Sequence, residues 1–250
     1  MKKIFLPLIL GLIAVTATAE ITLENSGAAD AQIDVGGAGS LTLSSFDAGT
    51  AADTYVVVAV ATKLKTDMAN PVTSVTFGGT TLTKICEEFV DDTYEGWAIL
   101  YGGALSGTGD VVANYTNPTL DSGSHEGIAF CVASYSDVSG TDAISAGVYD
   151  KGDPTGLTDS ITTTNDNSLI VSCVMLGGPE TFSQSGSTII VQECAVTSDD
   201  KIDNALLSLA APTAGTYGPD VNFSSQNRAS MCSAELTEQS APKATTFIVR

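Results

Sequence analysis

Tyr55-Val56-Val57-Val58-Ala59-Val60 is an unbroken apolar run in the first half of the chain. Val and Tyr side chains pack well on a pleated strand. An apolar run this short, without polar alternation, is typical of a strand that is buried on both faces. Leu169-Ile170-Val171 has the same character in the second half. The two runs therefore predict strands in the middle of a β-sandwich.

The chain around these runs follows a strand, turn, strand pattern. Val, Ile, Thr, Tyr and Phe fill short stretches, and turn residues such as Gly78-Gly79 and Asp153-Pro154 fill the gaps. No long helical period stands out. The expected strands are 41–45, 54–61, 72–77, 97–101, 111–116, 127–135, 168–176, 188–196, 205–209, 228–236 and 245–249. The sequence predicts an all-β protein, an antiparallel β-sandwich of the jelly-roll type.

Several landmarks recur at a fixed spacing of 108 residues. Cys86, Asp91-Asp92 and Asn114-Tyr115-Thr116 are matched by Cys194, Asp199-Asp200 and Asn222-Phe223-Ser224. With changes in loop length, residues 55–60 also align with 169–174, and Cys131 aligns with Cys232. The register runs without a gap through unlike residue types, which favours duplication over chance matching. We therefore expect two pseudo-repeats, at about 41–135 and 157–236.

The repeat leaves two architectures open. The halves could interleave into one jelly roll made of two Greek keys, or they could form two small sandwiches in tandem. No Pro- or Ser-rich linker separates them, because residues 150–160 read as an ordinary loop. We expect a single domain over residues 20–250.

The N-terminus has the pattern of a secretory signal peptide. A basic start, Met1-Lys2-Lys3, precedes an apolar run that ends at the small residues Ala17-Thr18-Ala19. The run is too short for a membrane anchor, which needs about 20 apolar residues, and Pro7 interrupts it. We expect residues 1–19 to be removed and the remainder to be secreted, either outside the cell, at its surface or in a periplasm.

The chain is strongly acidic, with a formal net charge of −19. Loss of Lys2 and Lys3 with the leader would leave eight of the ten basic residues against 29 acidic ones. Such a charge repels phosphates and anionic lipids, which argues against nucleic acids and membranes as partners. It favours solubility or bound cations.

Five cysteines make disulfides conceivable in an exported protein. The pseudo-repeats suggest two equivalent bridges, Cys86–Cys131 and Cys194–Cys232, with Cys173 left as a thiol in a core strand. The alternative is that all five are small buried hydrophobic residues. Sequence alone does not fix the connectivity, so both interpretations stay open.

Catalytic machinery is hard to find. His125 is the only histidine, so a Ser-His-Asp triad would have to use it, and no Gly-x-Ser-x-Gly elbow surrounds any serine. The pairs Glu87-Glu88 and Asp91-Asp92 lie in an expected loop before Trp97, where such pairs are usually solvated. We expect no enzyme, and a glycoside hydrolase with two facing carboxylates is a remote alternative.

Calcium is the one ion that the composition favours, because it takes six to eight oxygen ligands. The candidate ligands are Asp91, Asp92, Asp199 and Asp200, in turn-rich stretches. None matches the spacing of an EF-hand loop. We expect no obligatory cofactor, with calcium as the open alternative.

Residues 72–83 read Val-Thr-Ser-Val-Thr-Phe-Gly-Gly-Thr-Thr-Leu-Thr, two strands around a Gly-Gly turn. Residues 107–112 and 132–138 look like companion strands, with a weaker echo in 157–236. This signature resembles the concanavalin A-like and laminin-G-like jelly-roll modules of secreted and phage-associated proteins. The resemblance implies attachment, glycan binding or a surface-structural role. It does not imply an enzyme, because the Glu-x-Asp-x-Glu strand of the related glucanases is absent.

These observations predict a secreted, non-catalytic protein with a surface-structural or adhesive role. Self-assembly through exposed strand edges would make the chain its own partner. The alternative is a carbohydrate-binding, lectin-like module whose partner is a surface glycan. Trp97 is the candidate for stacking on a sugar, although Trp97 and Tyr101 share one face of an alternating strand, which favours a core position for both.

Overall fold

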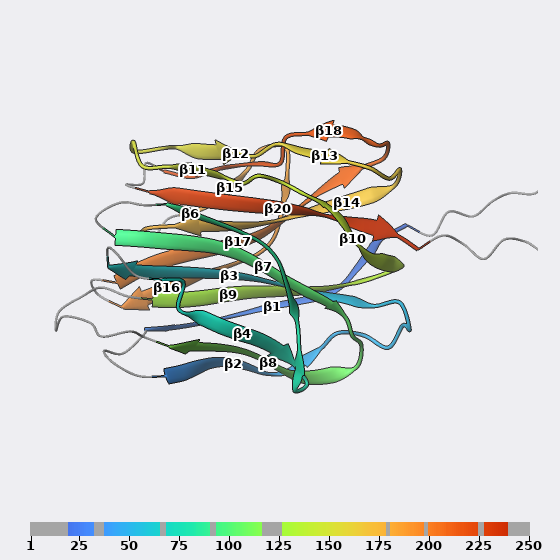
Figure 1. Cartoon of the computed structure of the whole chain (residues 1–250), viewed down its shortest axis with the longest axis horizontal. Helices are drawn as coiled ribbons and strands as arrows, with labels where there is room; N and C mark the ends of the chain where they lie inside the picture. The colour runs from blue at the N-terminus through green and yellow to red at the C-terminus, as the bar shows by residue number, and fades with distance from the viewer. Residues whose placement is uncertain are drawn as a thin grey trace, which may run out of the picture.

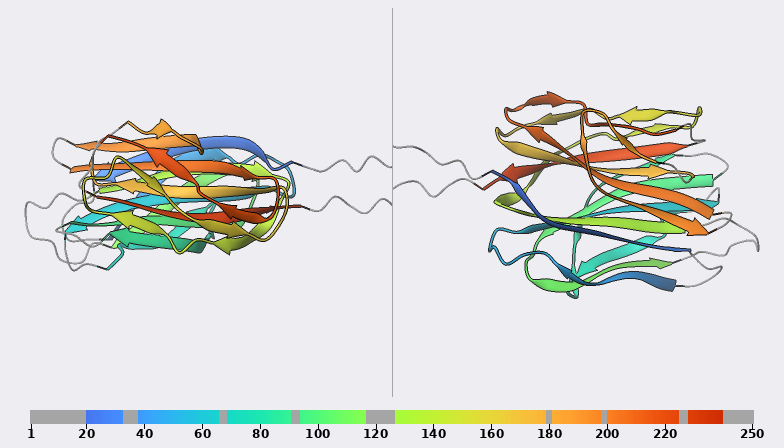
Figure 2. Two further views of the ribbon diagram at one scale, coloured as in Figure 1. Left: turned by 90° about the horizontal axis from the view of Figure 1, so that it is seen from above. Right: turned by 180° about the vertical axis from the view of Figure 1, so that it is seen from behind.

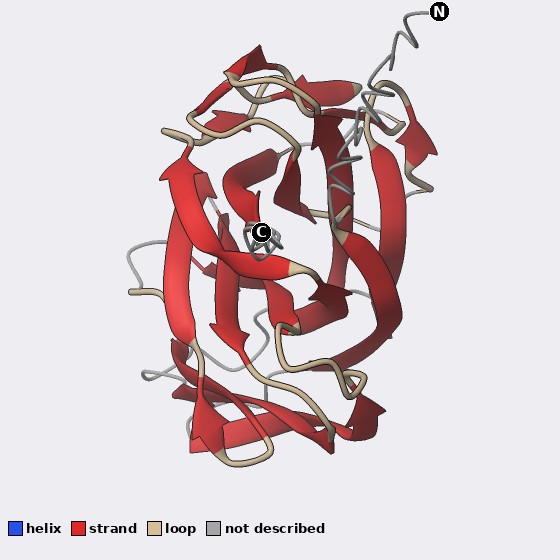
Figure 3. Cartoon of the chain, turned by 90° about the vertical axis from the view of Figure 1, so that its right-hand side faces the viewer, coloured by secondary structure: helices blue, strands red, loops and turns tan. Residues whose placement is uncertain are grey.

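The computed structural model describes residues 20–32, 38–65, 69–90, 94–116, 127–178, 181–197, 200–224 and 228–239. These residues form strands, turns and loops, and they contain no helix that could span a membrane. Figure 3 shows the resulting all-strand molecule. The prediction of an all-β fold is confirmed. The expected strand at 245–249 lies outside the described residues.

Two five-strand arrays form the middle of the molecule, and every strand pairing in them is antiparallel. Sheet A has the order β1 (Thr22–Gln32), β9 (Gly127–Ser136), β3 (Tyr55–Lys65), β7 (Tyr94–Ala104) and β6 (Thr83–Val90). Sheet C has the order β10 (Val138–Ile144), β20 (Ala229–Glu238), β14 (Ser168–Leu176), β17 (Asp200–Ala211) and β16 (Thr188–Thr197), and β11 (Val148–Asp150) also pairs with β20.

Smaller sheets lie outside these two. Sheet B has the order β2 (Ala38–Asp47), β8 (Thr108–Thr116), β4 (Val72–Phe77) and β5 (Thr80–Thr81). Sheet D contains β12 (Gly156–Thr158), β19 (Asp220–Asn222) and β15 (Ser183–Gln184), and sheet E contains β13 (Ile161–Thr163) and β18 (Gly215–Tyr217). In Figure 1, sheet B lies at the bottom and sheets D and E lie at the top.

Three buried layers of side chains hold the sheets together. Val56, Val58 and Val60 of β3 pack in the layer between sheets A and B. Val57 and Ala59 of the same strand pack in the layer between sheets A and C. A third layer lies between sheet C and the short strands of sheet D. The apolar run at 55–60 is therefore buried on both faces, as its sequence predicts.

Sheets A and C share one strand order. Numbered along the chain within each sheet, the order in space is first, fifth, second, fourth and third. In sheet A, Ala59 lies between Cys131 and Leu100 on its two neighbouring strands. In sheet C, Cys173 lies between Cys232 and Leu206 in the same way. Seen from behind in Figure 2, edge strand β1 of sheet A lies beside edge strand β16 of sheet C.

The outer strands β6 of sheet A and β16 of sheet C also pair with their neighbours in the same way. Leu100 lies opposite Cys86 of β6, and Leu206 lies opposite Val191 of β16. Each of these outer strands has a bulge just before that residue. The residue of β16 that occupies the place of Cys86 is thus Val191, three positions before Cys194. The expected match of Cys86 with Cys194 is therefore wrong, because the two outer strands pair in a register that differs by three residues from the spacing of 108.

Local sequence explains the tightest hairpin, between β4 and β5. Gly78 and Gly79 form its turn with φ angles of 54° and 82°. Two successive residues with positive φ match the twist of the flanking strands, and glycine reaches this conformation without steric cost. The Gly-Gly turn expected from the sequence is therefore present, between Phe77 and Thr80.

Candidate ligand-binding site

An aromatic pair marks the outer edge of sheet A. Phe89 of β6 lies directly opposite Trp97 of β7. Their ring centroids are 6.2 Å apart with an angle of 21° between the ring planes, an offset stack. Trp97 is 7% exposed and belongs to the layer between sheets A and B, whereas Phe89 is 48% exposed. The Phe89 ring is thus exposed to solvent, and it packs against the buried Trp97 ring.

Polar groups lie beside the exposed ring. Glu87 and Phe89 are two residues apart on β6, so their side chains share one face of the strand. Glu87 Oε1 is 2.7 Å from Lys84 Nζ, and Glu87 Oε2 accepts a hydrogen bond of 3.0 Å from Asn70 Nδ2. The Asn70 side chain is itself fixed, because its Oδ1 accepts a bond of 3.0 Å from the backbone N–H of Val72. The face of β6 that carries Phe89 therefore also carries a carboxylate, to which an amide and an ammonium group are bound.

Tyr101 lies on the neighbouring strand β7. Its side chain is buried in the layer between sheets A and B. Burial, with a smaller contribution from the charge of Glu87, raises the pKa of Tyr101 to about 12. The phenol is therefore neutral at ordinary pH. Tyr101 and Trp97 are both core residues, as expected from their alternation.

The expectation that the residues before Trp97 form a loop is wrong for this edge of sheet A. Glu87 and Glu88 lie in strand β6 and not in a loop. An edge strand tolerates charged side chains, because its outer backbone and much of one face are open to solvent. Phe89 and Asn70 are functional candidates that the sequence does not single out. The alternation Glu87-x-Phe89 is typical of a strand, and Trp97 follows a few residues later. This pattern could have indicated a hairpin with both aromatic rings on one face.

The other candidates of the sequence are only partly covered. Asp91, Asp92, Asp199 and His125 lie outside the described residues, and Asp200 is described only as the first residue of β17. Within the described ranges, no three Cys, His, Asp or Glu side chains are grouped to hold a metal ion. Calcium binding by the four aspartates stays a prediction.

The predicted disulfides Cys86–Cys131 and Cys194–Cys232 are wrong. In each pair the two cysteines lie on strands separated by two others, β6 from β9 and β16 from β20. Three strand spacings amount to about 14 Å, whereas the Cα atoms of a disulfide lie within about 7 Å. The position of two cysteines within a repeat does not show how many strands separate them in the sheet. Cys86, Cys131, Cys173 and Cys232 are buried thiols, and the Cys194 side chain is not described.

A buried carboxylate on the far side of sheet C has a structural role. Glu235 is fully buried and accepts bonds from Ser168 Oγ at 2.6 Å and from the backbone N–H groups of Asn165, Thr164 and Ala143 at 3.0, 3.1 and 3.2 Å. Burial acts to raise the pKa of Glu235, but these hydrogen bonds outweigh it and hold the pKa below its usual value. Its oxygens are used to tie loop 164–165 to strands β10, β14 and β20.

A second polar group is a chain of hydroxyls and a carboxylate. Ser172 Oγ and Ser233 Oγ are 2.9 Å apart, and Ser233 Oγ donates to Asp159 Oδ2 at 2.7 Å. All three side chains are buried. No imidazole lies among the described residues, so the chain has no visible base to activate either serine. The arrangement joins β14 and β20 to the segment before β13.

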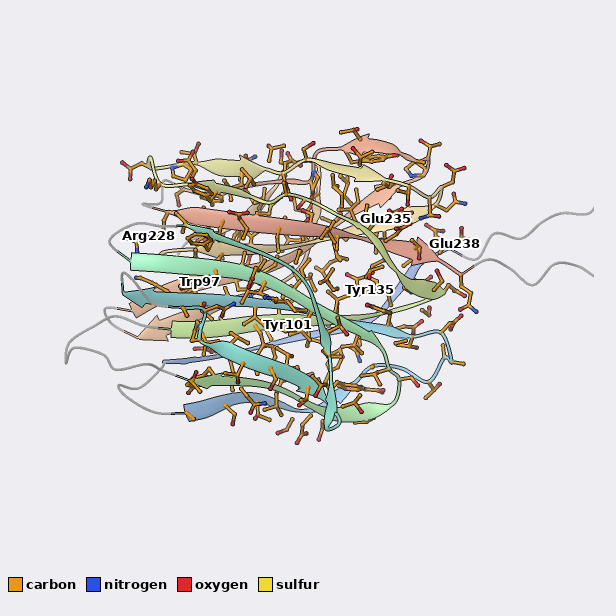
Figure 4. The ribbon with its side chains drawn as sticks, in the orientation of Figure 1. Trp97, Tyr101, Tyr135, Arg228, Glu235 and Glu238 are labelled. Atoms are coloured by element: carbon orange, nitrogen blue, oxygen red, sulfur yellow. The ribbon has the colours of Figure 1, made fainter. Side chains whose placement is uncertain are left out.

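Glu238 is one of the residues that line a cavity of about 250 Å³, and it lies at the other end of the strands from Trp97 (Figure 4). Apolar residues and two carboxylates line the cavity: Glu20, Ile21, Asn167, Ser168, Leu169, Ala210, Ala211, Pro212 and Glu238. None of the described residues that line it has an aromatic ring on which a ligand could stack. The Phe89 edge is therefore the better candidate for recognition.

Comparisons with protein-family models, curated proteins and solved structures give no significant match.

Proposed function

We propose that the protein is an exported, non-catalytic carbohydrate-binding protein that recognises glycans through Phe89. The observation that carries the proposal is an exposed phenyl ring stacked on a buried indole, with Glu87 and Asn70 beside it. A sugar ring has a C–H face that packs against an aromatic face, and its hydroxyl groups bond to carboxylate and amide groups. The Phe89 edge offers both kinds of contact.

The site is also ordered before any ligand arrives. Trp97 fixes the Phe89 ring, and both oxygens of Glu87 already have partners in Asn70 and Lys84. Side chains that are held in place lose less conformational entropy when a ligand binds.

The proposal includes export and an internal duplication. The pattern of residues 1–19 supports cleavage of a signal peptide after Ala19 and a location outside the cytoplasm. The common strand order of sheets A and C supports two pseudo-repeats of the jelly-roll type. Their matching strands run from β1 to β9 and from β10 to β20, so the repeats begin before the expected 41–135 and 157–236. Attachment to glycans would agree with the modules that residues 72–83 resemble.

The test is a glycan array with residues 20–250, followed by calorimetric titration of the best binder. Phe89→Ala is expected to weaken binding roughly tenfold, since stacking on one ring contributes about 1–1.5 kcal/mol. Leu23→Ala is the matched control, because Leu23 is a similarly exposed apolar residue on β1, the opposite edge strand of sheet A from β6. Absence of binding to any glycan, or equal binding by Phe89→Ala, would contradict the proposal.

A second candidate function is self-assembly into a surface layer or filament. The observation that favours it is that sheet A ends in β1 and β6, each of which pairs with a neighbour on one side only. Open edges can pair with strands of another copy. Light scattering after gel filtration tests this, and a monomer at all concentrations would contradict it.

A further inference from the structure

Four cysteines meet in the layer between sheets A and C. Cys86 comes from β6, Cys131 from β9, Cys173 from β14 and Cys232 from β20. Their thiols bond to separate backbone groups and, among the described residues, no three of them are grouped as a metal site. Whether any of them can form a disulfide therefore depends on which two thiols lie near each other.

One pair faces across the layer. Cys232 Sγ donates to the carbonyl oxygen of Ala98 on β7 at 3.4 Å, and Cys86 Sγ donates to the carbonyl oxygen of Ser233 on β20 at 3.7 Å. Cys86 Sγ thus reaches the residue that follows Cys232, and Cys232 Sγ reaches β7, the strand that pairs with β6. Cys86 is also close enough to contribute to raising the pKa of Cys232, after the larger effect of burial.

The neighbouring cysteine Cys173 makes its hydrogen bonds to other residues. It lies directly opposite Cys232 in sheet C, but its thiol donates towards Val60 O at 3.5 Å and Asn204 Oδ1 at 3.7 Å. We propose that Cys86 and Cys232 form a disulfide that joins sheet A to sheet C when the chain folds in an oxidising compartment.

The other half of the molecule shows why only one such link is expected. Cys131 Sγ donates to the carbonyl oxygen of Asn204 at 3.6 Å, and Asn204 occupies in sheet C the place of Ala98 in sheet A. The contact between sheets therefore occurs twice. In the second copy the place of Cys86 is taken by Val191, so the Cys86–Cys232 pair has no equivalent there.

The chemistry needs a disulfide donor, such as oxidised glutathione or a thiol-disulfide oxidase of the exterior. The Cys86 thiolate attacks a donor sulfur and releases one donor thiolate. The Cys232 thiolate then attacks the Cys86 sulfur of the mixed disulfide and releases the second. The donor is reduced to two thiols, which take up the two protons. Burial raises the pKa of Cys232 in the folded protein, so the exchange belongs to folding, before the two sheets close.

The test is refolding of residues 20–250 in a glutathione redox buffer, followed by alkylation in denaturant and peptide mapping. We expect three alkylated cysteines, Cys131, Cys173 and Cys194, and one linked pair of peptides that contains Cys86 and Cys232. Five alkylated cysteines, or a link between any other pair, would overturn the proposal. Cys173→Ala is the matched control, because it should keep the link and leave two alkylated cysteines.

Stability gives a second measurement on the same sample. The oxidised protein should melt roughly 5–15 °C above its reduced form, because the link closes a long loop in the unfolded chain. Cys86→Ala should melt at one temperature whatever the redox buffer, and a redox-dependent midpoint in that variant would contradict the assignment. The inference rests on the export in the proposed function but not on carbohydrate binding, so failure of one leaves the other standing.

Discussion

Trp97 is the single tryptophan of the chain, and its position under Phe89 makes it a natural reporter of the candidate site. Its emission should shift to longer wavelength in Phe89→Ala, because the indole then loses its cover and meets water. A glycan that stacks on Phe89 should change the same signal in the wild type. The emission spectrum thereby reports on the environment of Trp97 at the candidate site, both in the variant and in the wild type with glycan.

Glu235 is the residue whose loss should cost most outside the apolar core. Glu235→Gln places an amide N–H₂ among backbone donors that now face a carboxylate, and we expect a loss of about 1–3 kcal/mol in the free energy of unfolding. Urea denaturation measures it. Glu238→Gln, a partly exposed change on the same strand, is the control and should stay within about 0.5 kcal/mol of the wild type.

The pH dependence of that loss follows from the direction of the pKa shift. The pKa of Glu235 is lower in the folded protein than in the unfolded chain. Its ionised form therefore stabilises the fold above the unfolded-state pKa, and this stabilisation disappears as the pH falls through the folded-state value. The difference between wild type and Glu235→Gln should shrink between pH 7 and about pH 3. A difference that grows on acidification would contradict the assignment.

Strands buried on both faces are the elements that the sequence predicts well. The apolar runs at 55–60 and 169–171 lie in β3 and β14, the central strands of sheets A and C. Edge strands are harder to find. β1 reads Thr-Leu-Glu-Asn-Ser-Gly-Ala-Ala-Asp-Ala-Gln, without a run of β-branched residues, and it is held by its pairing with β9. The candidate site is missed for the same reason, because β6 carries Lys84, Glu87 and Glu88 on an edge.

Cysteine pairing shows a second limit of sequence reasoning. Alignment of the halves matches Cys86 with Cys194 and Cys131 with Cys232, but a disulfide depends on which strands are neighbours in space. The order of sheet A places β3 and β7 between Cys131 and Cys86, and no local pattern encodes that order. The pairing across the layer between sheets A and C becomes visible only with the structure.

The matched geometry of β6 and β16 makes a prediction at the level of these elements. Val191→Cys places a thiol where Cys86 stands in the other half, across the layer from Cys131. After refolding in a glutathione buffer we expect a second link, between Cys131 and position 191, and a further rise of roughly 5–15 °C in the melting midpoint. A variant that forms no link at position 191 would show that the two contacts between sheets are not alike.

At the scale of the whole molecule, sheets A and C have one core in common. Val57 of sheet A and Leu206 of sheet C belong to the same buried cluster. Neither sheet can unfold without exposing the apolar face of the other, so we expect a single thermal transition. Calorimetry should give equal calorimetric and van 't Hoff enthalpies. Two separate transitions, or a Leu206→Ala variant that lowers the midpoint of only part of the signal, would contradict this.

The shared strand order of the two central sheets has a consequence for the history of the chain. In the duplication that we propose, the layer between sheets A and C was once the interface of a symmetric dimer, in which every residue occurred twice. Fusion of the two copies removed that constraint. The positions of Phe89 and Trp97 are now held in the second half by Cys194 and Asp203, and that of Cys86 by Val191. Under that proposal, the Phe89 edge and its counterpart on β16 descend from one surface and have since come to carry different side chains.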